Sequence, residues 1–195
     1  MSTGPTSAED TALLLEPRRL TVEEYHRMIE AGILDEDEHV ELLEGVIVAM
    51  SPHGGPHARC IQWLNRYLVR TLSDAYVVRP QLPLTLRPRN EPEPDLAVVR
   101  AEMASDEPHP ASAILAIEVA GSSLRLDRMI KAAVYARHGI TEYWIVNVEA
   151  RVVEVFTDPD TATGAYRRTR KVTKAETLVS EALPQVSFPV AELFG

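Results

Sequence analysis

Apolar residues recur at helical spacing in three stretches of the chain. The first, residues 21–31, opens with Thr21 and Glu24, a pair that forms a capping box at a helix N-terminus. The second covers residues 57–72 and the third covers residues 127–138. Glycine follows the first and third stretches, as it often does where helices end. The pattern therefore predicts three helices.

Short apolar runs separated by turn residues predict β-strands elsewhere. Residues 39–50 form two such runs around Glu44-Gly45, a pair that suits a tight hairpin. The strand, helix and strand within residues 114–148 indicate a parallel strand pair joined by a right-handed crossover. The remaining expected strands are residues 95–99, an edge segment at 76–87 that prolines interrupt, and a hairpin formed by 151–156 and 166–172.

One α/β domain accounts for this alternation of strands and helices. A chain of 195 residues with 45% hydrophobic residues suits a single well-packed core. We expect residues 1–18 to be a flexible leader and residues 19–195 to be the domain. The leader lacks the basic and apolar segments of a signal peptide, and no apolar run approaches the roughly 20 residues that span a bilayer. Because Cys60 is the single cysteine and cannot form an intramolecular disulfide, the expected location is the reducing cytoplasm, with no membrane partner.

Charge is distributed unevenly along the chain. The sequence has 20 Lys and Arg against 29 Asp and Glu, a net charge of −9, which argues against a protein that coats DNA by neutralising phosphates. Acidic residues concentrate in 23–44, whereas basic residues form two clusters. The clusters are Arg59, Arg66, Arg70, Arg79, Arg87 and Arg89, and Arg167, Arg168, Arg170, Lys171 and Lys174. They fit either a local anionic partner or the solvated faces of a helix and a hairpin.

Glu118 lies inside the apolar strand predicted at residues 114–119, where an unpaired carboxylate costs several kcal/mol. Asp95 opens the preceding strand, and antiparallel pairing of the two strands would bring Asp95 next to Glu118. Two adjacent carboxylates repel each other, so they raise a pKa or bind a cation, and Mg²⁺ suits their oxygens. Lys131, near the start of the next helix, can reach the same cleft. Together these residues predict a metal site.

The order of these motifs resembles a known family. Glu93-Pro94-Asp95 before a strand and a later strand ending in Glu118-Val119 are similar to the PD-(D/E)XK nuclease superfamily. A narrower likeness, to a bacterial family of restriction-endonuclease-like proteins long described as a domain of unknown function, covers about residues 20–171. It rests on ELLEG at residue 41, His57 at a helix start, EPDLAVV, IEV, DRxxKxxxYA from residue 127, and EYWIV. The likeness implies a restriction-endonuclease-like mixed sheet flanked by helices, with an N-terminal helix and an added β-hairpin.

The resemblance also implies roles for particular residues. The ligands of a Mg²⁺ or Mn²⁺ ion would be Asp95, Glu118, the Val119 carbonyl and Glu41 as an additional acid. Lys131 would orient the attacking water or help to deprotonate it. The superfamily usually carries this lysine two residues after the second acid, where this chain has Ala120. In the narrower family the lysine lies on the following helix, as Lys131 does.

Simpler explanations exist for several of these residues. Asp127 and Lys131 are four residues apart, which also suits a surface ion pair on a helix. Glu41 lies in the acidic stretch, where most carboxylates face solvent. Glycine and proline separate His53 from His57, so a substrate or phosphate contact by His57 is favoured over a histidine metal site. The residues expected in the core are Tyr135, Tyr143 and Trp144.

Three functional hypotheses follow. The first is a Mg²⁺-dependent nuclease that hydrolyses phosphodiester bonds, with DNA as the substrate by resemblance. The second is a catalytically silent binding or scaffold module, acting as a homodimer with a partner protein; intact Asp95, Glu118 and Lys131 favour the first, and the negative net charge favours the second. The third, a sugar hydrolase with paired carboxylates, needs neither metal nor lysine. A homodimer would also help a nuclease of this size to hold a duplex.

Overall fold

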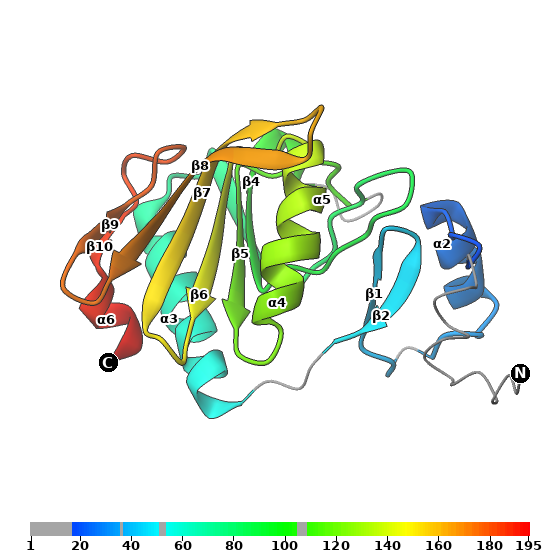
Figure 1. The fold of residues 1–195 in the computed structure, drawn as a ribbon, viewed down its shortest axis with the longest axis horizontal. Coiled ribbons are helices and arrows are strands. Elements are labelled where there is room, and N and C mark those ends of the chain that lie inside the picture. Colours follow the sequence, from blue (N-terminus) through cyan, green and yellow to red (C-terminus); the bar gives the residue numbers. More distant parts are fainter. Residues whose placement is uncertain (1–16, 36, 51–53, 105–108) are drawn as a thin grey trace, which may run out of the picture.

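A computed structural model of the chain describes residues 17–35, 37–50, 54–104 and 109–195. Within this part of the chain, six strands form a central mixed sheet in the order β3-β4-β5-β6-β7-β8 (Figure 1). The strands are β3 (Tyr76–Pro80), β4 (Leu96–Arg100), β5 (Leu115–Ala120), β6 (Glu142–Asn147), β7 (Val152–Asp160) and β8 (Ala165–Thr173). Strands β5 and β6 pair in parallel, and the other neighbours are antiparallel. The parallel pair predicted from the sequence is confirmed.

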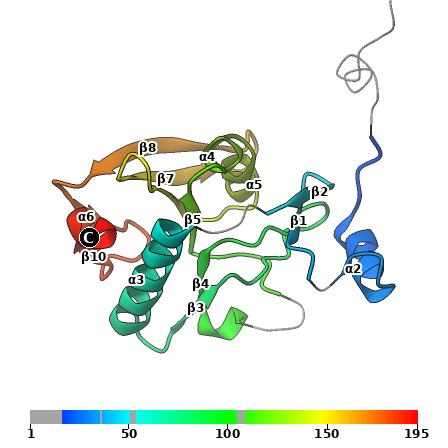
Figure 2. The ribbon, with the colours of Figure 1, turned by 90° about the horizontal axis from the view of Figure 1, so that it is seen from below.

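Helices cover both faces of the sheet. α3 (Gly55–Thr71) and α6 (Val190–Phe194) lie on one face, and a continuous helical segment lies on the other (Figure 2). This α4–α5 segment consists of α4 (Leu124–Leu126), the π-helical turn η2 (Asp127–Lys131) and α5 (Ala132–Arg137). Successive strand residues point to opposite faces, so Val98 joins the core under α3 whereas Val99 joins the core under α5. The central strands are therefore buried on both faces, as their apolar sequences predict.

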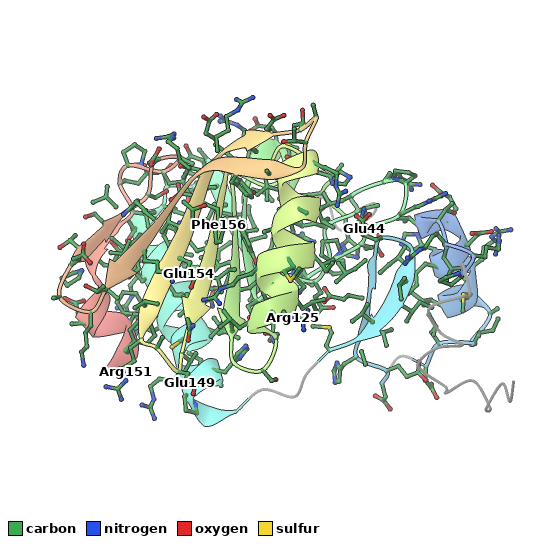
Figure 3. The ribbon with its side chains drawn as sticks, in the orientation of Figure 1. Glu44, Arg125, Glu149, Arg151, Glu154 and Phe156 are labelled. Atoms are coloured by element: carbon green, nitrogen blue, oxygen red, sulfur yellow. The ribbon has the colours of Figure 1, made fainter. Side chains whose placement is uncertain are left out.

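An ion pair fastens the α4–α5 segment to the sheet. Arg128 donates from two guanidinium nitrogens to the carboxylate of Glu154, with Nε 2.9 Å from Oε2. Glu154 lies in the middle of β7 and is almost fully buried (Figure 3). Because a bidentate pair fixes orientation as well as distance, this contact helps to decide which residues of the helix face the end of β5.

The N-terminal helix, α2 (Val22–Glu30), forms where the capping box predicts it. The Thr21 Oγ1 accepts a hydrogen bond from the Glu24 N–H, and a Glu24 carboxylate oxygen accepts one from the Thr21 N–H. Val22 and Tyr25 pack against Leu42 of the hairpin. The helix therefore covers the hairpin rather than the central sheet.

The predicted hairpin consists of β1 (Val40–Leu43) and β2 (Val46–Ala49), joined at residues 44 and 45. A Cβ at residue 45 would lie 2.8 Å from the Leu20 carbonyl oxygen, so the turn requires glycine there. Backbone groups of Leu42 and Glu91 exchange hydrogen bonds of 2.8 and 3.2 Å. This attachment holds β1 beside the segment that leads into β4.

Several boundaries differ from those predicted. The third helix begins at Leu124, three residues early, and contains the π-helical turn. The edge segment is a strand only to Pro80, because proline removes ladder donors. The last hairpin is longer than predicted, since β7 and β8 stay paired as far as Asp160 and Ala165. The sequence pattern does not predict η1 (Ala101–Met103), β9 (Thr177–Val179) or β10 (Ser187–Pro189), which are too short to show a period.

The leader predicted at residues 1–18 lies outside the described residues, except for residues 17 and 18. His53 also lies outside them. Among the residues that the structure does describe, no helix combines the length and the apolar character needed to cross a bilayer.

Candidate active site

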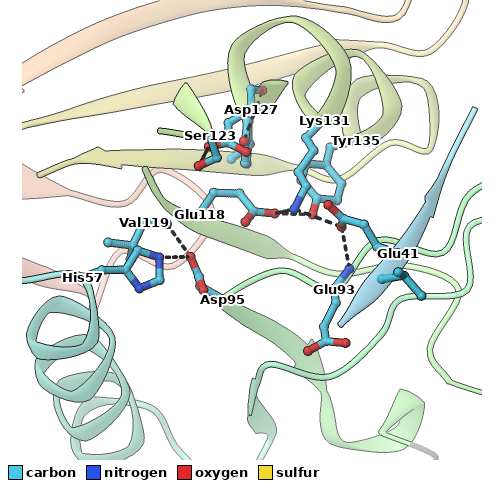
Figure 4. A network of polar contacts seen from close by, with 12 residues as sticks. Glu41, His57, Glu93, Asp95, Glu118, Val119, Ser123, Asp127, Lys131 and Tyr135 are labelled. Atoms are coloured by element: carbon cyan, nitrogen blue, oxygen red, sulfur yellow. Dashed lines mark hydrogen bonds and ion pairs between the residues drawn. The ribbon is translucent and has the colours of Figure 1, made fainter. Parts of the chain in front are cut away.

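A cleft of about 470 Å³ opens where the hairpin, the start of α3, the end of β5 and the α4–α5 segment meet. Figure 4 shows the polar network inside it. The lining includes all six site residues predicted from the sequence: Glu41, His57, Asp95, Glu118, Val119 and Lys131. The fold thus brings these residues to one place from five separate segments.

Asp95 and Glu118 are neighbours across β4 and β5. The antiparallel register of the two strands sets the residue before β4 opposite Glu118. Asp95 Oδ2 accepts a hydrogen bond of 2.7 Å from the Val119 N–H and lies 3.2 Å from His57 Nε2. The side chain expected to contact substrate, His57, therefore also holds one of the two predicted acidic ligands.

Lys131 lies between two carboxylates. Its Nζ is 3.0 Å from Glu41 Oε2 and 3.0 Å from Glu118 Oε1, and its side chain is almost fully buried. Glu41 is buried as well, and its Oε2 accepts a hydrogen bond of 3.1 Å from the Glu93 N–H. Two of the simpler explanations are therefore wrong: Glu41 does not face solvent, and Lys131 does not form a surface pair with Asp127. Both side chains point into the protein because contacts with segments distant in sequence compensate their charge.

Tyr135 is a contact of the site that the sequence does not reveal. It is fully buried, as predicted for a core residue, but its hydroxyl donates a hydrogen bond of 2.8 Å to Glu118 Oε1. The same oxygen accepts the Lys131 hydrogen bond, so two donors hold one oxygen of Glu118. Lys131 and Tyr135 are one α-helical turn apart and present both donors to the same carboxylate.

Asp127 completes this face of the helix. It is 1% exposed, lines the cleft and accepts a hydrogen bond of 2.8 Å from Ser123 Oγ. Asp127 begins the π-helical turn, an irregularity frequent at functional sites. A signal for Asp127 exists in the sequence: it precedes Lys131 by four residues, so the two polar side chains share one helix face.

Burial dominates the electrostatics of the cleft. It raises the pKa of Glu118 well above its ordinary value, and the Lys131 ammonium offsets only part of this effect. Burial also raises the pKa of Glu93, and it raises the pKa of Asp127 to about 6. For Lys131, burial acts to lower the pKa, but the carboxylates of Glu118, Glu41 and Asp127 together raise it above its ordinary value. Lys131 is therefore a cation at neutral pH.

The donor set of the cleft suits a hard divalent cation. Among the described residues, the carboxylates that line the cleft are those of Glu41, Glu93, Asp95, Glu118 and Asp127, beside the Lys131 ammonium. This excess of buried negative charge favours a cation, and carboxylate oxygens are the ligands that Mg²⁺ and Mn²⁺ prefer. The hydrogen bonds above engage one oxygen each of Asp95 and Glu118, and the second oxygen of each receives none of them.

The side chains are not already arranged as a metal centre. In the described residues, no three Asp, Glu, His or Cys side chains converge as metal ligands would. Lys131 instead holds Glu41 and Glu118 on either side of its ammonium. Binding an ion would therefore require these carboxylates to move toward it.

The chain resembles known proteins in family and in fold. A family model, Uma2, described as "Putative restriction endonuclease", matches residues 22–191. No match to a curated protein is found. Among solved structures, the chain is similar to one described as a putative nuclease belonging to DUF820 from Anabaena variabilis ATCC 29413, with 16% identity and a TM-score of 0.71 over 90% of this chain and 97% of that chain. The predicted α/β fold, a restriction-endonuclease-like mixed sheet flanked by helices, is confirmed.

Proposed function

Because this chain belongs to the Uma2 family of putative restriction endonucleases, we propose that it is a divalent-metal-dependent nuclease that hydrolyses phosphodiester bonds in DNA. The observation that carries this proposal is the convergence of Asp95, Glu118 and Lys131 in one cleft. Hydrolysis of a phosphodiester requires that negative charge on the phosphate be offset in the transition state. Paired acids that can hold a cation, with a fixed ammonium beside them, supply groups of this kind.

Asp95, Glu118, the Val119 carbonyl and Glu41 would hold Mg²⁺ or Mn²⁺ in this proposal. A bound ion would offset charge on the scissile phosphate and lower the pKa of a nearby water molecule. The protein's own contribution is to anchor one oxygen each of Asp95 and Glu118 before the carboxylates move toward an ion. The Val119 N–H fixes Asp95 Oδ2, and the Lys131 and Tyr135 donors fix Glu118 Oε1.

Lys131 acts as a hydrogen-bond donor rather than as a base. Its raised pKa keeps the ammonium protonated, so it orients the attacking water and stabilises charge on the phosphate. The water adds to phosphorus, the bond to the leaving oxygen breaks, and that oxygen takes a proton from solvent. The proton of the attacking water passes to a carboxylate of the cleft. Asp127, with a pKa of about 6, has the basicity that suits this transfer near neutral pH.

The proposal is tested by incubating the purified full chain with single- and double-stranded DNA and with RNA, in Mg²⁺, Mn²⁺ or EDTA. Cleavage of DNA that requires the metal is expected. Asp95→Asn, Glu118→Gln and Lys131→Met should each lower kcat at least about a hundredfold, because each removes charge compensation needed in the transition state. The matched control is Glu102→Gln, which removes one exposed carboxylate outside the cleft and should leave kcat unchanged.

Two results would contradict the proposal. Cleavage that persists in both Asp95→Asn and Lys131→Met would place the chemistry elsewhere. Failure of the folded wild-type chain to cleave any of these substrates would favour the catalytically silent binding module. The homodimer stays a prediction, which sedimentation showing only monomer would contradict.

A further inference from the structure

Helix α3 is basic along one face. Its 17 residues, Gly55–Thr71, include no Asp or Glu, although the whole chain has a net charge of −9. Arg59, Arg66 and Arg70 are all exposed on this helix. At 3.6 residues per turn these three positions fall within about 40° of one another around the helix axis. They form an exposed stripe, called here the α3 stripe.

The structure separates the α3 stripe from the rest of the basic cluster seen in the sequence. Arg79 is almost fully buried, with a guanidinium nitrogen 3.2 Å from His109 Nδ1. Arg87 forms an ion pair with Glu23 of α2. Arg89 lies outside the helix, in the segment between β3 and β4. Three arginines of the cluster therefore lie outside α3, and the other three share one face of this helix.

No carboxylate of the described residues forms an ion pair with the arginines of the α3 stripe. The second basic cluster, on β8, is different. There, Arg167 Nη2 is 3.1 Å from Asp160 Oδ2, and Arg168 Nη2 is 2.9 Å from Glu181 Oε2. Two of the β8 arginines are therefore paired with carboxylates of the protein, whereas the arginines of the α3 stripe are available to an external anion.

The end of α3 that carries the first arginine of the α3 stripe also contributes to the candidate active site. His57, in the first turn of α3, lines the cleft, whereas Arg59, two residues later, lies about 160° away around the helix axis, on the exposed face. From Arg59 to Arg70 the helix rises about 17 Å, which corresponds to about five phosphates of one B-form strand. Figure 2 shows α3 leading away from the hairpin and the α4–α5 segment, on its own side of the sheet.

We propose that the α3 stripe binds the phosphate backbone of the nucleic-acid substrate where that strand leaves the cleft. This inference rests on the proposed nuclease function and identifies where the protein obtains its affinity for a polyanion. The cleft repels phosphates through its carboxylates, and the net charge of the chain is negative. At physiological salt, charges further apart than about 8 Å are largely screened, so the local stripe outweighs the distant acids.

The test uses the full chain with Arg59, Arg66 and Arg70 all replaced by Gln. Glutamine is nearly as good a helix former as arginine, so α3 should persist, and circular dichroism checks this. The matched control replaces Arg167, Arg168 and Arg170 of β8 by Gln, which removes the same charge from residues held by contacts within the protein. Two measurements are made on each variant: steady-state cleavage, and binding of the same DNA in EDTA as a function of salt.

With a duplex of about 30 base pairs, we expect KM of the stripe variant to rise at least about tenfold with kcat unchanged, because uniform binding is lost. With a substrate of about three nucleotides, whose axial length of about 10 Å is well short of the stripe's about 17 Å, KM should change less than about twofold. The salt slope of binding should fall by up to about 2.7, since each phosphate contact contributes about 0.9. Three such contacts account for a roughly 40-fold loss of affinity between 50 and 200 mM salt. The β8 variant should behave as the wild type does.

The outcomes separate this inference from the proposed function. If the wild type cleaves DNA and the stripe and β8 variants have the same KM and salt slope, the binding role of the α3 stripe is wrong and the nuclease proposal stands. Absence of cleavage together with salt-dependent binding that the stripe variant loses contradicts the nuclease but supports the surface. Absence of both cleavage and binding overturns both.

Discussion

Replacing Lys131 by Met removes the ammonium from between two buried carboxylates. Methionine is close to lysine in length and flexible enough to fill the same space, so packing changes little. What changes is charge: Glu41 and Glu118, each with an oxygen 3.0 Å from Nζ in the wild type, are left without this partner. The variant therefore isolates the electrostatic contribution of Lys131.

The expected loss follows from burial. Lys131 is 4% exposed, Glu41 is 3% exposed and Glu118 is 5% exposed, so solvent does little to compensate the remaining charges. Removing one partner of a buried ion pair costs about 3–5 kcal/mol. We expect a loss of this size in the free energy of unfolding at pH 8 without metal. It is a large share of the about 5–15 kcal/mol by which domains are stable.

The loss should depend on pH with a definite sign. In the variant, the folded-state pKa of Glu118 lies still further above its unfolded value, so the folded protein binds more protons than the unfolded chain. The stability of the variant therefore falls as pH rises through this range, and its deficit relative to the wild type shrinks toward pH 5. Urea unfolding followed by the fluorescence of Trp63 and Trp144 measures this deficit.

A double variant provides the internal control. Adding Glu118→Gln to Lys131→Met removes one of the two uncompensated charges and should recover part of the lost stability, a coupling expected for residues in contact. A loss of less than about 1 kcal/mol in the free energy of unfolding of Lys131→Met at pH 8, or a double variant no more stable than the single one, would show that the ammonium does not compensate these carboxylates.

Three further predictions concern other buried polar groups. Asp127→Asn should raise the free energy of unfolding without metal by up to about 3 kcal/mol at pH 8, because burial raises the pKa of Asp127 to about 6. This gain should vanish below about pH 4, where the carboxyl is protonated in the folded and the unfolded state. Urea unfolding across this pH range measures it. Tyr135→Phe removes one of the two donors to Glu118 and should lower kcat about ten- to a hundredfold with KM unchanged, measured by steady-state cleavage; an unchanged kcat would exclude a positioning role. Glu142→Gln should lower the free energy of unfolding by about 1–3 kcal/mol, because the fully buried carboxylate accepts three hydrogen bonds and an amide nitrogen cannot accept any. Hydrogen exchange should show earlier opening of residues 180–183 in this variant, and unchanged exchange would contradict the prediction.

Parts of the fold could be predicted because their signals are local. The capping box at Thr21, the Glu44-Gly45 turn and the parallel pair β5–β6 depend on neighbouring residues or on one short crossover. The short strands β9 and β10 could not, because three residues show no alternation and their pairing depends on the rest of the sheet. The π-helical turn could not be predicted either, because the four-residue spacing of Asp127 and Lys131 suits an α-helix equally well.

The residues of the candidate site also differ in how far the sequence alone could predict them. Glu118 could be found because an acid in an apolar strand requires compensation, and Asp95 followed from strand pairing. The inward position of Lys131 came from resemblance, because helical spacing alone suits a surface pair with Asp127. The role of Tyr135 could not be predicted, since burial and aromatic character suit a core residue, and only the tertiary structure places its hydroxyl on Glu118.

In the proposed function, Asp95 and Glu118 hold a divalent cation in the cleft. Anomalous diffraction from a crystal of the full chain soaked in Mn²⁺ locates such an ion without requiring activity. We expect a peak bound by oxygens of Asp95 and Glu118 and by the Val119 carbonyl, and no peak there in Asp95→Asn. An anomalous map with no peak in this cleft, or with Mn²⁺ only at other carboxylates, would contradict it.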